Sequence, residues 1–169
     1  ELIDIIPEFN LYEEFWKIYT KTDIIPPQYI SAEAVVERSI IGEGSEIHGE
    51  VYNSVIGPGV VIKKGSVVRN SIIMKQSFIG ENVTIDKAII AENVTVGNNV
   101  VMGVGEDVPN KEKPRVYSFG LVTIGENSVI PADVRIGINT AIVGETTPED
   151  YPDGELASGE TLNKEGETA

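Results

Sequence analysis

The chain has 169 residues and carries 27 acidic side chains against 13 lysines and arginines, which gives a formal net charge of −14. Half of this excess lies in residues 145–169, where eight carboxylates accompany one lysine, so the remainder is only moderately acidic. Binding to a nucleic-acid backbone requires clustered cations. The sequence shows no basic stripe, and nucleic acid is therefore excluded as a partner.

The chain contains no cysteine, which excludes disulfides and thiolate chemistry and fits a reducing compartment such as the cytoplasm. No apolar run approaches the length of about eighteen residues that a membrane span needs. No basic segment followed by an apolar one marks a signal peptide. We therefore expect no membrane partner. The chain begins with Glu1 rather than Met, which indicates a fragment or a processed chain.

Residues 1–31 differ from the rest in their aromatic content and contain the only tryptophan. A short helix over about residues 10–19 is predicted by apolar side chains at helical spacing, Leu11, Phe15 and Ile18. The Pro26–Pro27 pair then favours an extended segment. Two interpretations stay open for this segment: a cap on the first repeat of the domain that follows, or a joint against a further domain.

An aliphatic residue returns with a fixed period through residues 32–144. In the most regular part the steps are six, six and five residues, repeated, at Ile56, Ile62, Val68, Ile73, Ile79, Ile85, Ile90 and Val96. Three short strands per cycle can wind a triangular coil whose aliphatic side chains point inward and stack on their copies in the next coil. Gly and Asn follow these positions and suit corners, because they adopt left-handed backbone angles at low cost. An antiparallel sheet is the alternative, but it predicts no fixed period.

The repeat is not uniform along the chain. Residues 48–55 are slightly out of step, so we expect that coil to be a little short. Residues 106–118 contain two prolines and a charge cluster and predict a loop, after which the period resumes at Ile124. Residues 145–169 are polar, and we expect an acidic C-terminal tail whose last nine residues are mobile.

Few residues carry obvious chemistry. His48 is the only histidine, so a site of several histidine ligands cannot form, and we expect no metal site. Some acyltransferases with this kind of repeat use one histidine as a general base. His48 lies at a corner position, however, and nothing beside it in the sequence suggests a group that would orient it. No catalytic residue is therefore assigned in this chain.

Three cations lie within five residues of the predicted loop, at Lys111, Lys113 and Arg115. A proline between them stiffens the segment, and together they could hold a phosphate group. The alternative is a solvated loop that Glu112 partly neutralises. Lys63 and Lys64 form a second, weaker pair on the coil surface.

Three stretches of the chain together resemble one enzyme family. The start, NLYEEFWKIYT followed by PPQYI, resembles the segment that joins the catalytic and C-terminal domains of bacterial glucose-1-phosphate adenylyltransferase, also called ADP-glucose pyrophosphorylase. The run VERSIIGEGSEIHGEVYNSVIGPGVVIKKGSVVRNSIIM is similar to the β-helix domain of that enzyme, and GLVTIGENSVIPADVRIG is similar to its closing coils. The resemblance covers nearly all of residues 1–160.

The resemblance implies an all-β fold, a left-handed parallel β-helix; the periodicity alone does not give the hand. It also implies a parent enzyme that makes ADP-glucose and pyrophosphate from ATP and glucose 1-phosphate with Mg²⁺, in glycogen biosynthesis in the cytoplasm. The catalytic residues of that family lie in an N-terminal domain that nothing here matches. This chain would then be the non-catalytic assembly and regulatory domain. Its partners would be its own N-terminal domain and further copies, as a tetramer.

One position departs from the family pattern. In regulated relatives the strand matching GLVTIGE ends near a basic residue that contacts a phosphorylated effector, whereas Gly125 and Glu126 stand here. Either regulation is weak or another cation, such as Arg115, serves. A catalytically degenerate sister subunit also stays open. The alternative from another functional class is a free-standing hexapeptide-repeat acyltransferase that uses His48.

Overall fold

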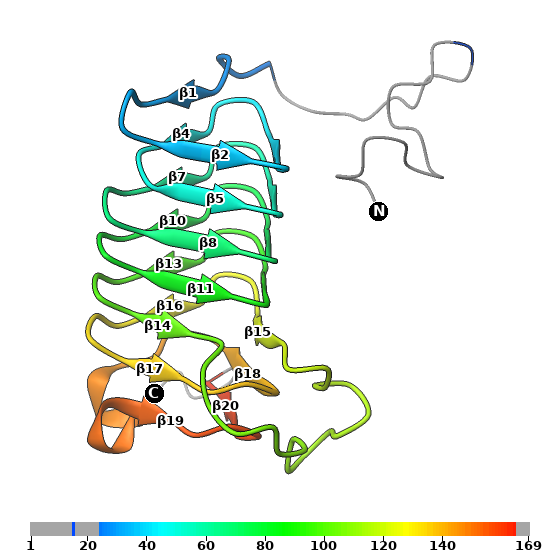
Figure 1. The fold of residues 1–169 in the computed structure, drawn as a ribbon. Helices are drawn as coiled ribbons and strands as arrows, with labels where there is room; N and C mark the ends of the chain where they lie inside the picture. The colour runs from blue at the N-terminus through cyan, green and yellow to red at the C-terminus, as the bar shows by residue number, and fades with distance from the viewer. Residues whose placement is uncertain (1–14, 16–23, 165–169) are drawn as a thin grey trace.

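The computed structural model describes Phe15 and residues 24–164. Residues 29–163 wind around one axis as three parallel sheets, each covering one side of a triangular prism (Figure 1). In Figure 1 the front strands run to the right and the chain returns behind them as it descends, which is a left-handed coil. The predicted left-handed parallel β-helix is confirmed. No helix within the described residues is long and apolar enough to cross a membrane.

Each sheet stacks one short strand from each successive coil. Sheet A contains β1 (Tyr29–Ile30), β4 (Glu46–Ile47), β7 (Val61–Ile62), β10 (Phe78–Ile79), β13 (Thr95–Val96) and β16 (Val129–Ile130). Sheet B contains β2 (Val35–Glu37), β5 (Glu50–Tyr52), β8 (Val67–Arg69), β11 (Thr84–Asp86), β14 (Val101–Met102), β17 (Arg135–Ile136) and β19 (Glu155–Leu156). Sheet C contains β3 (Ile40–Ile41), β6 (Val55–Ile56), β9 (Ile72–Ile73), β12 (Ala88–Ile90), β15 (Val122–Ile124), β18 (Thr140–Val143) and β20 (Thr161–Asn163).

The core consists of aliphatic side chains stacked in register along the axis. Ile56, Ile73 and Ile90 pair one above another in sheet C and are at most 1% exposed, as the period predicts. The column continues through Ile124 to Ile142. Complete burial of each such side chain contributes about 1.5–3 kcal/mol. Branching at Cβ also favours the extended backbone that each strand needs.

The corners depend on residues that tolerate left-handed backbone angles. Asn53 and Asn70 both have a φ of +50°, and their side chains form a ladder in which the Asn53 amide donates to Asn70 Oδ1 at 2.8 Å. Asn70 in turn donates to Asp86 Oδ1 at 2.8 Å. At another corner, a Cβ on Gly42 would lie 2.6 Å from the backbone nitrogen of Pro58. Only glycine therefore lets these two coils approach so closely.

The N-terminal boundary differs from the expected one. β1 begins at Tyr29 and pairs with β4, so the first coil starts before residue 32. The helix expected over residues 10–19 lies outside the described residues, apart from Phe15, whose side chain is 99% exposed. The choice between a cap and a joint therefore stays a prediction.

The C-terminal tail expected over residues 145–169 is where the structure differs most. Residues 145–164 complete another coil, with two 3-10 turns, Pro148–Asp150 and Pro152–Gly154, followed by β19 and β20. Leu156 stacks on Ile136, and the side chain of Tyr151 is buried in the core. The composition of residues 145–164 is polar because only a few of their side chains enter the core. Residues 165–169 lie outside the described residues.

Candidate functional site

The candidate site lies on the loop between β14 and β15. Ile85 and Met102 are equivalent inward residues of sheet B, and Ile90 and Ile124 are equivalent inward residues of sheet C. Ile90 follows Ile85 after five residues, whereas Ile124 follows Met102 after 22, so the additional residues form a loop at this corner. The loop projects from the side of the stack, to the right of β18 and β20 in Figure 1, before it enters β15. It leaves at Gly103, whose φ is +87°, and a Cβ there would collide with the carbonyl oxygen of Asp86. Glycine is therefore required where the loop departs.

Asn139 fastens both ends of this loop to the solenoid. Its side-chain nitrogen donates to Asp107 Oδ1 and to the carbonyl of Val108, each at 2.8 Å. Its side-chain oxygen accepts the backbone N–H of Gly120 at 2.8 Å. Asn139 is only 3% exposed, so these bonds satisfy a buried amide that would otherwise destabilise the fold.

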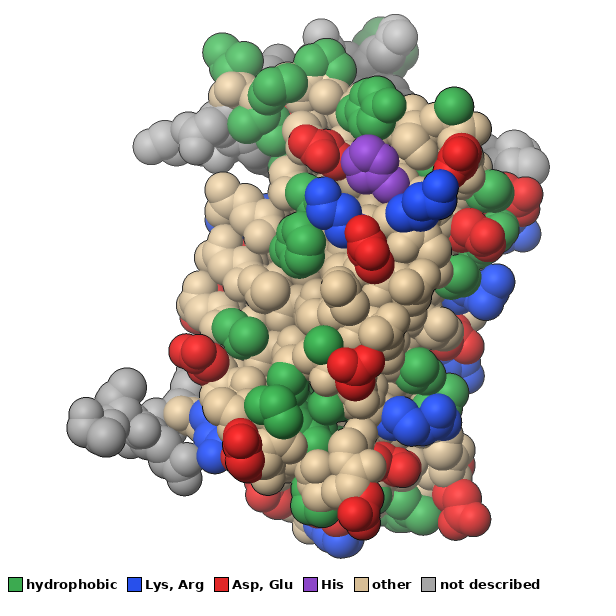
Figure 2. Space-filling model, turned by 90° about the vertical axis from the view of Figure 1, so that its left-hand side faces the viewer, with side chains coloured by type: hydrophobic (Ala, Val, Ile, Leu, Met, Phe, Trp, Pro, Cys, Tyr) green, Lys and Arg blue, Asp and Glu red, His purple; other side chains and the backbone are tan. Residues whose placement is uncertain are grey.

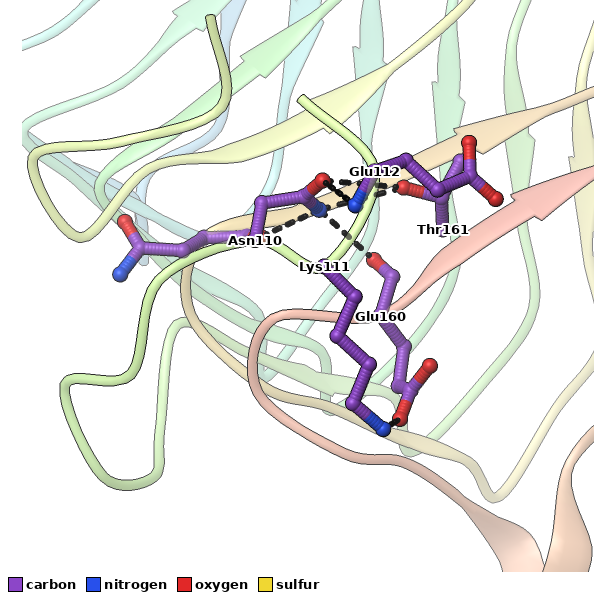
Figure 3. Close-up of polar contacts among 6 residues, drawn as sticks. Asn110, Lys111, Glu112, Glu160 and Thr161 are labelled. Atoms are coloured by element: carbon purple, nitrogen blue, oxygen red, sulfur yellow. Dashed lines mark hydrogen bonds and ion pairs between the residues drawn. The ribbon is translucent and has the colours of Figure 1, made fainter. Parts of the chain in front are cut away.

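Asn110 fastens the middle of the loop to the last coil (Figure 3). Its side-chain nitrogen donates to the carbonyls of Asn139 and Glu160 and to Thr161 Oγ1 at 3.0–3.3 Å. Its side-chain oxygen accepts the backbone N–H groups of Glu112 and Lys113 at 3.0 and 2.8 Å. The loop is thereby ordered around a buried amide. Neither asparagine was found from the sequence, because asparagine is common in loops and corners for other reasons.

The three cations predicted to hold a phosphate occupy different environments. Lys111 forms an ion pair with the Glu160 carboxylate (Figure 3), and its backbone N–H donates to the carbonyl of Gly159 at 2.8 Å. Lys113 and Arg115 lie in an exposed turn in which the Lys113 carbonyl accepts the N–H groups of Val116 and Tyr117. The structure thus leaves two cations on the turn exposed and pairs the third with an acidic side chain.

His48 lies at a corner that is two residues shorter than its neighbours. Val51 follows Ile47 after four residues, whereas Val68 follows Ile62 after six, which confirms the short coil. The His48 ring is 5.7 Å from that of Tyr29, and its Nε2 is 3.7 Å from the Glu46 carboxylate. Figure 2 shows the imidazole at the surface among acidic and basic side chains.

The short corner brings together side chains from the coils on either side of it. Lys64 Nζ lies 2.6 Å from the Glu33 carboxylate, although another coil runs between the two turns that carry them. Lys64 lowers the pKa of the Glu33 carboxyl, first through this hydrogen bond and then through its charge. Lys63 lies 5.7 Å from the centre of the Phe78 ring. The second predicted lysine pair is therefore held by intramolecular contacts.

A shallow groove of about 570 Å³ lies under the last coil. Its lining includes four carboxylates, and the complete set is Asp150, Pro152, Asp153, Glu155, Leu156, Ala157, Glu160 and Thr161. Asp150 is paired with Lys164 at 2.7 Å, which lowers the pKa of the Asp150 carboxyl. In the part of the chain that the structure describes, no group of three or more His, Cys, Asp or Glu side chains is arranged to hold a metal ion.

The sequence matches the family described as "GlmU-like, C-terminal hexapeptide" over residues 27–124, more than half of its length. The chain belongs to this family. The match starts just before β1 and ends in β15, so it covers the regular coils of this hexapeptide domain and the loop that carries the three cations.

Named relatives match the hexapeptide domain over almost all of its length. "Glucose-1-phosphate adenylyltransferase" of Lachnospira eligens is 64% identical over 167 residues, which are 99% of this chain and 40% of that protein. The protein of the same name from Thermotoga neapolitana is 53% identical over 160 residues, 95% of this chain and 38% of that protein. The chain thus spans about two fifths of the length of these relatives and corresponds to their C-terminal part.

Among solved structures, a hexapeptide transferase family protein from Anaplasma phagocytophilum is similar with a TM-score of 0.46 and 14% identity. The similarity covers 80% of this chain and 69% of that one.

Proposed function

We propose that this hexapeptide domain is the non-catalytic C-terminal part of a glucose-1-phosphate adenylyltransferase. The parent enzyme would convert ATP and glucose 1-phosphate to ADP-glucose and pyrophosphate with Mg²⁺, in the cytoplasm and in glycogen biosynthesis. The observation that carries this proposal is the 64% identity to a protein of that name over 99% of the chain. The domain's role would be to assemble subunits, as a tetramer, and to transmit regulation.

The decisive experiment compares the 169-residue chain with the complete polypeptide. We expect pyrophosphate release from ATP and glucose 1-phosphate only from the complete polypeptide. His48→Ala in that polypeptide should leave the rate unchanged, because His48 contacts Glu46 and Tyr29 rather than a catalytic group. Transfer of an acyl group from an acyl-coenzyme A, abolished by His48→Ala, would instead establish the acyltransferase alternative.

We further propose that Lys111, Lys113 and Arg115 bind the phosphate of an effector. The support is their position on a projecting loop that two buried asparagines hold in place. Each charge-assisted hydrogen bond is worth about 1.5–3 kcal/mol when desolvated and less when it is exposed to solvent. The loop would thus supply a fixed backbone, two exposed cationic side chains and a third, Lys111, that must leave Glu160 to reach an anionic ligand.

The effector site is tested by Lys111→Ala combined with Arg115→Ala in the complete enzyme. We expect the effector concentration for half-activation to rise at least about tenfold, because the variant removes two cations and the loss of one charge-assisted hydrogen bond already implies that factor. The matched control is Lys63→Ala with Lys64→Ala, which removes the same charge from a different corner. An activation curve that is unaltered by the first pair, or shifted equally by both pairs, would refute this site.

A further inference from the structure

Phe119, near the end of the loop, combines two features that cost free energy within the chain alone. Its φ is +64°, in the left-handed region that a bulky side chain rarely adopts. Its side chain is 88% exposed, so contacts within the described fold do not offset that cost. The next residue, Gly120, is held by the hydrogen bond from its N–H to Asn139 Oδ1 at 2.8 Å. A strained and exposed residue on a fixed backbone indicates a contact with something outside the chain.

Phe119 belongs to a loop tip, which we define as residues 113–119. The tip also exposes Val116, at 67%, and the cations Lys113 and Arg115. Its backbone forms a turn in which the Lys113 carbonyl accepts the N–H of Val116 at 2.9 Å. Two apolar side chains beside two positive charges fit a partner surface that has an apolar hollow and acidic walls.

The groove under the last coil presents a surface of this kind. Four carboxylates line it, and two of them are already paired with lysines of the same chain. The other two, Asp153 and Glu155, are exposed and leave the groove acidic. The apolar part of the lining is Pro152, Leu156 and Ala157. With a volume of about 570 Å³, the groove is large enough to admit an aromatic side chain.

The groove of the same molecule does not hold the loop tip. Asn110 and Lys111 fasten the loop to Thr161 and Glu160 at the edge of the groove (Figure 3). Phe119 nevertheless stays almost fully exposed, so it does not lie in this groove. Loop and groove thus occupy the same end of the solenoid (Figure 1). Two copies that meet at this end around a two-fold axis can each place the tip in the other's groove, so that the same contact forms twice.

We propose that the loop tip docks into the groove of a second copy of this chain. Phe119 is the apolar anchor, and Lys113 and Arg115 lie beside the exposed carboxylates of the groove. The inference rests on the proposed function only in its assembly role, for which it names the two surfaces. A tip of this size buries little surface, so docking is weak unless further contacts of the complete polypeptide hold the copies together. Docking occupies two of the cations proposed for the effector, so inorganic phosphate should compete with it.

The test cross-links two differently tagged copies of the complete polypeptide, co-expressed, each carrying one added cysteine. Ser118→Cys in the first copy places a thiol beside Phe119 without removing that side chain. Ala157→Cys in the second copy places a thiol in the groove. Ala32→Cys is the matched control for the second copy, because Ala32 is also exposed but lies just after β1, at the opposite end of the solenoid. A short bismaleimide is added, and the linked peptides are identified by mass spectrometry. A link between positions 118 and 157 can then join only two different copies.

We expect the link from position 118 to position 157 to be at least tenfold more abundant than the link from 118 to 32. Phe119→Ala in the first copy should reduce the 118–157 link at least tenfold. Phe78→Ala, at an exposed phenylalanine of sheet A, should leave it unchanged. Equal amounts of the two links, or a 118–157 link that persists in Phe119→Ala, would overturn the proposal.

Two further measurements on the same samples separate this inference from the proposed function. Inorganic phosphate should lower the 118–157 link severalfold relative to sodium chloride at equal ionic strength. A link that phosphate leaves unchanged would support docking and refute the effector role of the two cations. Full nucleotidyl transfer without the link would overturn docking and leave the proposed function standing, whereas the link without nucleotidyl transfer would do the reverse.

Discussion

The coils from β1 to β14 and the region after them are stabilised in different ways. In the first part the same contact recurs: an inward Ile or Val stacks on the next, and corner asparagines form ladders. In the second part the Ile column continues through Ile124 to Ile142, but single polar residues add contacts that occur once, such as the three hydrogen bonds of Asn139. A repeat distributes stability over many equivalent rungs, whereas the loop and last coil depend on a few particular side chains.

The largest expected effect is on a central rung of the regular coils. Ile73→Ala removes a fully buried side chain held between Ile56 and Ile90, and we expect it to lower the free energy of unfolding by about 2–5 kcal/mol. The matched variant Leu162→Ala acts on a half-buried rung of the last coil and should cost less than half as much. Denaturant unfolding of both variants measures the difference. Equal costs would show that the last coil is as tightly coupled as the regular stack.

The next effect concerns the asparagine that holds the loop. Asn139→Ala leaves the Gly120 N–H and the Val108 carbonyl without their partner and places alanine at a φ of +55°, so we expect a loss of about 2–4 kcal/mol. Hydrogen exchange at Gly120 should become about 10–100 times faster.

The control for this variant is Asn127→Ala. Asn127 has nearly the same φ, +56°, but it is exposed, and its side chain accepts one hydrogen bond, from Asn93. We expect a loss of about 1 kcal/mol and no change in exchange at Gly120. If both variants cost the same, the buried contacts of Asn139 would not be what orders the loop.

The sequence predicts the regular part well and the irregular part poorly, for a physical reason. The stacking of Ile56, Ile73 and Ile90 follows from a period, because equivalent positions must lie above one another once the coil closes. The burial of Tyr151 and Leu156 follows from no period, since the 3-10 turns lengthen the path between rungs. The predicted tail was wrong for residues 145–164 for this reason.

In the candidate site, too, the sequence predicts one feature and misses another. Its cations are visible as a cluster in the sequence, but their environments depend on contacts made across the fold. The ion pair between Lys111 and Glu160 joins residues 49 positions apart. The amide of Asn110 likewise reaches Thr161, 51 positions away. No local pattern marks either partner, so the sequence alone could not separate Lys111 from the two exposed cations.

A smaller effect on the free energy of unfolding should appear at high pH, through the Tyr151 phenol in the last coil. Burial raises the pKa of the Tyr151 phenol to about 12, while its contact with Thr146 Oγ1 at 2.8 Å acts in the opposite direction. The pKa is higher in the folded state than the ordinary value of about 10. The stability that this group contributes is therefore present below pH 10 and lost between pH 10 and 12.

We expect this loss to amount to at most about 2 kcal/mol. Unfolding measured from pH 9 to pH 12 should be less pH-dependent in Tyr151→Phe than in the original chain. Thr146→Val removes the hydrogen bond that lowers this pKa, so it should extend the loss to higher pH. An unchanged profile in Tyr151→Phe would mean that the phenol is accessible to solvent and that the last coil opens locally.

The smallest effect on stability is expected from the ion pair with Glu160, which distinguishes Lys111 from the other two cations of the loop. Glu160→Gln removes the partner of Lys111, and because Lys111 is largely exposed, the loss should be below about 1 kcal/mol. Phosphate binding should respond in the other direction: a released Lys111 would lower the effector concentration for half-activation severalfold. Glu155→Gln, on the same coil and also lining the groove, removes an equal charge without touching Lys111. If both variants change the effector concentration for half-activation equally, the net charge of this region would control phosphate binding, and competition between Glu160 and the phosphate for Lys111 would not.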